Sequence, residues 1–68
     1  MMWFYPERRM VVVNTKTERA FRGVLWRARG RYLVLRNAEL LGPGGERTHL
    51  DGEVVIERAN VDFVQVMD

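Results

Sequence analysis

The sequence predicts an all-β fold: a single five-stranded, strongly bent antiparallel barrel that follows a short N-terminal arm. Apolar and polar residues alternate along several short segments, which is typical of half-buried strands. Gly23 lies inside one of these segments, where a glycine usually marks a sharp bend or a close approach of two backbones. Helical periodicity is absent beyond the first few residues. We therefore expect an arm over residues 1–9 and a barrel domain over residues 10–68.

The first two strands are expected over residues 10–14 and 19–27. The run Met-Val-Val-Val that opens the first one indicates burial on both of its faces. Alternation divides the second into an inward set and an outward set. The inward residues are Phe21, Gly23 and Leu25, and the outward residues are Arg22, Val24 and Trp26.

The other three strands are expected over residues 31–41, 49–58 and 61–67. A tight turn ending at Gly30 precedes the third strand, because glycine readily adopts the positive φ that such turns need. A Gly- and Pro-rich loop follows it at residues 42–47. The inward residues of these strands are Leu33, Leu35, Val54 and Ile56.

The arm combines an aromatic run with a helix-start signal. Pro6 followed by Glu7 fits the first turn of a short helix, where the missing N–H of proline is harmless. Trp3, Phe4 and Tyr5 have two interpretations. They anchor in a partner's pocket, as aromatic residues often do at interfaces, or they cap the open end of their own barrel.

Two sets of residues, in order along the chain, look like a pair of family motifs. The first set is Phe21, Gly23, Leu25, Leu33, Leu35 and Ala38, and the second is Gly52, Val54, Ile56, Asn60 and Val61. Together they resemble the Sm-like (Sm/LSm/Hfq-type) family of small, SH3-like barrels over about residues 10–66. The resemblance implies a non-enzymatic protein that closes into rings through exposed strand edges, and we expect the fourth and fifth strands to be these edges.

The residues with which RNA-binding members of that family hold a base are not retained. The turn between the second and third strands is one residue shorter, and Tyr32 stands where the family has Asn. Glu57 and Arg58 replace the Arg-Gly of the second motif. A carboxylate at this place repels phosphates, and the loss of glycine removes a close backbone approach. The resemblance thus implies the fold and the assembly but not the uridine-type pocket.

Composition excludes several classes of function. The chain has no cysteine and a single histidine, His49, so it has neither disulfides nor thiolate metal sites. No nucleophile–base pair, metal cluster or phosphate-binding loop can be assembled, so we expect no catalytic, cofactor or metal residues and no enzyme. The apolar run over residues 1–5 is too short for a signal peptide or a membrane span. These features predict a protein of the cytoplasm, or of a virion assembled there, with no membrane contact.

The net charge is only +2, but the two parts of the chain differ strongly. Residues 1–38 carry nine basic and two acidic residues, whereas residues 39–68 carry two basic and seven acidic ones. This asymmetry predicts either a nucleic-acid face or a head-to-tail contact between unlike surfaces. The candidate nucleic-acid residues are Arg27, Arg29, Arg31 and Tyr32, which surround the Gly30 turn. The alternatives for this hairpin are a solvated tip or salt bridges to a neighbour's acidic strands.

Several outward positions are apolar, which favours contact with another subunit. They are Val24, Trp26, Val34, Val55 and Phe63. A monomer seldom exposes so many neighbouring apolar residues, and a 68-residue core needs support beyond itself. We therefore predict a homo-oligomer, such as a ring, that serves as a structural component bound to another protein of a larger assembly, for example a phage virion. The alternative prediction is an RNA- or DNA-binding ring that uses the Arg27, Arg29 and Arg31 hairpin.

Overall fold

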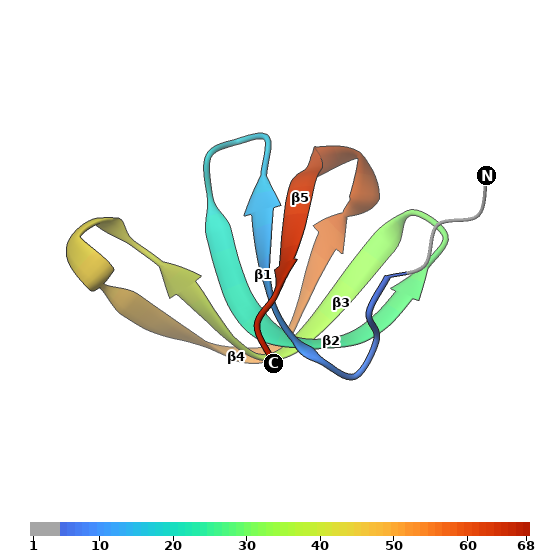
Figure 1. The fold of residues 1–68 in the computed structure, drawn as a ribbon, viewed down its shortest axis with the longest axis horizontal. Helices are drawn as coiled ribbons and strands as arrows, with labels where there is room; N and C mark the ends of the chain where they lie inside the picture. The colour runs from blue at the N-terminus through green and yellow to red at the C-terminus, as the bar shows by residue number, and fades with distance from the viewer. Residues whose placement is uncertain (1–4) are drawn as a thin grey trace.

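The structure is a computed structural model that describes residues 5–68, and these residues form one strongly bent antiparallel sheet (Figure 1). Its strands are β1 (Met10–Thr15), β2 (Ala20–Arg29), β3 (Tyr32–Leu41), β4 (Arg47–Glu57) and β5 (Val61–Val66). Two 3-10 turns, η1 (Pro43–Gly45) and η2 (Arg58–Asn60), connect β3 to β4 and β4 to β5. The order across the sheet is β4-β3-β2-β1-β5. The all-β prediction is confirmed, and β4 and β5 are the edge strands, as expected.

The core is built from the inward residues of all the strands. Its buried members are Val11, Val13, Leu25, Leu33, Leu35, Ala38 and Ile56, and Phe21, Val54, Val61 and Val64 pack against them. Val12 points to the other side of β1 and is nevertheless only 6% exposed. The prediction that β1 is buried on both faces is therefore confirmed. The inward sets predicted for β2, β3 and β4 are also confirmed.

Gly23 lies where the backbones of β2 and β3 approach each other closely. A Cβ atom at this position would lie 3.0 Å from the carbonyl oxygen of Arg36 and 3.1 Å from the Cα of Ala38. The β2–β3 register shifts here, between Arg22 and Val24. Backbone atoms cannot move aside as a flexible side chain does, so only glycine fits this approach without a shift of the strands.

The outer part of the β3–β4 hairpin projects from the barrel (Figure 1). The register between the two strands shifts between Arg36 and Ala38. Asn37 has φ 52° and Gly52 has φ 77°, so both strands depart from regular extended backbone at this level. Such bulges bend the strands and increase their twist. The molecule is consequently elongated, with extents of 37 × 21 × 21 Å.

The described part of the arm forms a turn and not the predicted helix. The backbone N–H of Glu7 donates to the carbonyl of Tyr5 over 2.8 Å, and Arg8 has a positive φ of 65°. Arg8 and Arg9 then exchange backbone hydrogen bonds with Leu25 of β2, at 2.6 and 2.9 Å. Pairing with a strand requires extended backbone, which explains why Pro6 starts a turn in this chain.

The two ends of the barrel domain are joined by a cluster of polar contacts. The Arg9 guanidinium lies 3.1 Å from the Asp68 carboxylate, and the backbone N–H of Met67 donates to the carbonyl of Met10 over 2.9 Å. A hydrogen bond from the backbone N–H of Met10, together with Arg9, lowers the pKa of the Asp68 side chain. Within residues 5–68, no helix is long and apolar enough to cross a membrane.

Candidate functional site

The β2–β3 turn and the η2 turn lie side by side at one end of the barrel. The backbone N–H of Arg58 donates to the carbonyl of Arg31 over 2.6 Å. Gly30 makes the tight turn with φ 55°, as predicted. A small cavity lies between the turns, and its lining residues are Gly30, Arg31, Glu57, Arg58 and Ala59. Residues from two distant parts of the chain thus form one surface.

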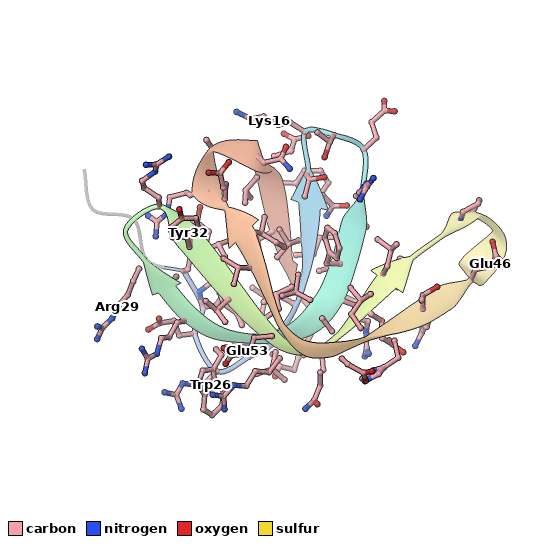
Figure 2. All side chains as sticks on the ribbon, turned by 180° about the vertical axis from the view of Figure 1, so that it is seen from behind. Lys16, Trp26, Arg29, Tyr32, Glu46 and Glu53 are labelled. Carbon is pink, nitrogen blue, oxygen red and sulfur yellow. The ribbon has the colours of Figure 1, made fainter. Side chains whose placement is uncertain are left out.

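The four predicted nucleic-acid residues gather at the β2–β3 tip. Arg27, Arg29 and Arg31 are all exposed, and Tyr32 is 44% exposed. Arg29 and Tyr32 are cross-strand partners and project at the same end of the molecule (Figure 2). Within residues 5–68, neither Arg27 nor Arg29 has a carboxylate within 4 Å, and Arg31 has only Glu57 at 3.8 Å. The tip is therefore an exposed and largely uncompensated cationic surface.

Trp26 lies on the outer side of the sheet, as alternation predicts (Figure 2). The guanidinium carbons of Arg8 and Arg36 lie 3.9 and 4.0 Å from the centroid of its indole ring. Arg36 is itself fixed by a 2.8 Å contact between its Nε and the Glu53 carboxylate. Cation–π contacts of this kind hold the indole within its own chain, so half-buried Trp26 offers little free apolar surface.

Ion pairs inside the chain balance part of the charge asymmetry. The sheet order places β2 beside β3 and β3 beside acidic β4, so that charged side chains of neighbouring strands meet. The pairs are Arg36–Glu53 at 2.8 Å, Arg22–Glu39 at 3.6 Å, Arg47–Glu39 at 3.7 Å and Arg31–Glu57 at 3.8 Å. Exposed pairs of this type contribute about 0–1 kcal/mol each. Neither of the two interpretations of the asymmetry accounts for this internal pairing.

The two edge strands each present apolar side chains to solvent. On β4, Val55 is 58% exposed, and on β5, Phe63 and Val66 are 52% and 43% exposed. Val24 and Val34, which lie with Val55 on the outer side of the sheet, are half-buried. A groove follows each free edge. The β4 groove includes Phe21, Val54, Val55 and Ile56, and the β5 groove includes Tyr5, Val61, Phe63, Val64 and Val66.

One solved structure shows the same arrangement of strands. A heptameric archaeal Sm protein, studied as a guide to the eukaryotic snRNP core, superposes with a TM-score of 0.78. The match covers 90% of this chain and 88% of that one, at 24% sequence identity. The chain has the Sm-like fold. The fold prediction and the resemblance that carried it are thereby confirmed. No protein-family model matches the sequence, and no curated protein matches it.

In this Sm-like barrel, the described aromatic residue of the arm turns inward. Tyr5 packs against the core, and the guanidinium carbon of Arg58 lies 4.8 Å from the centroid of its ring. For Tyr5, the contacts favour the interpretation in which the arm caps its own barrel. Trp3 and Phe4 lie outside the described residues.

Sequence reasoning missed one residue of the site, Arg58. Its side chain lines both the β5 groove and the cavity between the two turns. The signal was present, since Arg58 stands where the Sm-like pattern has glycine. Glycine has no side chain, so Arg58 adds a long cationic side chain to this surface. It also removes the close backbone approach that a glycine allows.

His49 lies inside β4, and not at its beginning as predicted, because β4 starts two residues earlier at Arg47. Its Nε2 is 3.4 Å from the Asp51 carboxylate. Among residues 5–68, no group of three or more histidine, aspartate or glutamate side chains is arranged to hold a metal ion.

Proposed function

We propose that this chain is a non-enzymatic subunit of an Sm-like homo-oligomeric ring, in which the β4 edge of one copy contacts the β5 edge of the next. The observation that carries the proposal is the pair of unpaired edges at opposite ends of the sheet, each with an exposed apolar residue, Val55 and Phe63. Because the two edges differ, the contact is heterologous and either closes into a ring or propagates. The heptameric assembly of the structurally similar archaeal Sm protein supports closure.

The size of the chain supports the same proposal. A domain of about 60 residues buries only about 60% of the surface of its unfolded chain, so a single core leaves it marginally stable. Unpaired strand edges also invite pairing with other chains. Pairing β4 with β5 of a neighbour would bury additional surface and would leave neither strand edge unpaired. The ring then acts as a structural component that presents the same surface from every subunit to a partner. Neither the fold nor the comparisons support a place in a virion, and the proposal does not extend to one.

Native mass spectrometry and light scattering test the ring directly. The expected result is one dominant species whose mass is an integral multiple of the 8.0 kDa subunit and does not change over a wide range of concentration. A monomer at high micromolar concentration would contradict the proposal. A ladder of ever larger species would indicate open, head-to-tail polymers.

A second function of the same ring, binding of single-stranded RNA or DNA, is supported by the tip. Arg27 and Arg29 are exposed and without a carboxylate partner in the described chain, and the Arg31 side chain is 81% exposed. Exposed Tyr32 beside them is a ring on which a base can stack. A closed ring would repeat this cationic tip in every subunit, which strengthens attraction to a phosphate backbone.

For this second function, we expect Arg29→Ala to weaken binding of single-stranded RNA and to flatten its salt dependence. Each lost phosphate contact should reduce the log–log slope of affinity against salt by about 0.7. The matched control is Arg47→Ala, which removes an equal charge next to Glu46, at the opposite end of the molecule from Arg29 (Figure 2). Fluorescence anisotropy over a salt series measures both slopes. Equal slopes for wild type and Arg29→Ala would exclude the tip as a phosphate site.

A further inference from the structure

Arg58 lacks the partner that a partly buried guanidinium normally has. Its Nε is buried without a hydrogen-bond acceptor, the only such side-chain atom in residues 5–68. No carboxylate of the described chain lies within 4 Å of the guanidinium, whose carbon lies 4.8 Å from the centroid of the Tyr5 ring. Removing a charged donor from water without supplying an acceptor is costly. A carboxylate from outside the chain would balance the charge of this guanidinium from the surfaces that Arg58 lines.

The position of Arg58 indicates where such a carboxylate would come from. Its side chain lines the groove along the free edge of β5, together with Val61, Phe63 and Val66. Asp62 is the other charged residue of this groove, and it lies beyond 4 Å of the guanidinium. In the proposed ring, this groove receives the β4 edge of a neighbour.

The β4 edge offers two carboxylates next to its exposed Val55, and they differ in availability. Glu53 is held by Arg36 at 2.8 Å. Glu57 has only the 3.8 Å contact with Arg31, and the two side chains are 60% and 81% exposed. A contact this open to water is weak, so Glu57 is free to take a second cation.

The direction of pairing also selects Glu57. All the paired strands in the sheet are antiparallel. If β4 of one copy pairs antiparallel with β5 of the next, and Val55 lies opposite Phe63, then Glu57 lies opposite Val61. This register joins the two exposed apolar residues on the same face and brings Glu57 to the Arg58 end of the groove. Parallel pairing with the same Val55–Phe63 contact would instead place Glu57 opposite Gln65, away from Arg58.

We infer that Glu57 of one copy is the carboxylate partner of Arg58 in the next copy, so that this charge pair exists only in the oligomer. The inference rests on the proposed ring and names the residues that fix its register. Glu57 and Arg58 replace the Arg-Gly of the Sm-like pattern, and this pairing gives both residues a role in assembly.

Charge reversal tests the pair. Arg58→Glu and Glu57→Arg should each raise the protomer concentration at half dissociation by at least about 30-fold, as expected when one member of a desolvated pair is lost. The double variant should return it to within a few-fold of wild type. Lys16→Glu, a charge reversal on an exposed residue of the β1–β2 turn that lines neither edge groove, should leave it unchanged. Sedimentation velocity over a concentration series gives the dissociation, and circular dichroism confirms that each variant folds.

Mixing the two single variants is a second test, which does not depend on the double variant folding. Each supplies the charge that the other lacks, so the mixture should form larger species than either variant alone. Failure of both the double variant and the mixture to restore assembly would overturn the inference and leave the ring itself standing. An unchanged oligomer with lost RNA binding in Arg58→Glu would overturn it in favour of a nucleic-acid contact. A wild-type monomer would instead refute the proposed ring.

Discussion

Gly23→Val is expected to lower the free energy of unfolding by about 2–3 kcal/mol, which is most of the stability of a domain this small. The new Cβ would meet the Arg36 carbonyl oxygen at 3.0 Å and the Ala38 Cα at 3.1 Å, and both are backbone atoms. β2 and β3 would have to separate at the bend to make room. Gly23→Ala introduces the same Cβ without the branch, and we expect a smaller loss of about 1 kcal/mol.

Thermal and urea unfolding of the purified variants measure these losses. Arg27→Val is the matched control, because it places the same side chain at an exposed position of the same strand. It should change stability by no more than about 0.5 kcal/mol. If Gly23→Val unfolds like this control, β2 and β3 do not approach closely at Gly23, and the bend must have another cause.

Phe63→Lys is expected to convert the oligomer into smaller species. Phe63 is 52% exposed in the single chain, so its replacement costs the folded subunit little. In the ring, the lysine ammonium would be forced into an apolar contact opposite Val55 of the neighbour, and burying an unpaired charge there is strongly unfavourable. Val55→Lys should act in the same way from the other edge.

Size-exclusion chromatography with light scattering reads out this change. Gln65→Lys is the matched control, since it adds the same side chain to the same strand, where the register places it opposite Glu53 of the neighbour. This control should keep the oligomer. Unchanged assembly in both Phe63→Lys and Val55→Lys would show that the free edges are not the contact, whatever the mass of the wild type.

The faces of the strands could be predicted from sequence because alternation depends only on local geometry. The inward positions of Leu33, Leu35 and Ile56 follow from the two-residue period of a strand. The bend at Gly23 was predictable for a similar reason, since glycine inside a strand has few other uses. The edge positions of β4 and β5 followed from the resemblance to the Sm-like family and not from alternation.

The pairing of charges could not be predicted, because it depends on register. The register shifts at Trp26, in the bulge between Leu25 and Arg27, and at Asn37, and alternation does not reveal such bulges. The sequence therefore showed two oppositely charged halves but not that Arg36 meets Glu53. The turn of the arm could not be predicted because hydrogen bonds to distant Leu25 fix it. The surroundings of Arg58 could not be predicted because they include Tyr5, which is far away in the sequence.

The placement of β5 beside β1 has a consequence for how the chain folds. β2, β3 and β4 are joined by short hairpin loops, so they can pair locally. Pairing of β1 with β5 is long-range, because it joins Val11 to Val66 and Val13 to Val64. Closing so long a loop slows folding, and it comes last because it needs the C-terminal strand. Until then one side of β1 is an unpaired edge, and β5 is not in place to receive a neighbour. In the proposed ring, a chain still being synthesised could therefore not take its place, so assembly would select subunits whose folding is complete.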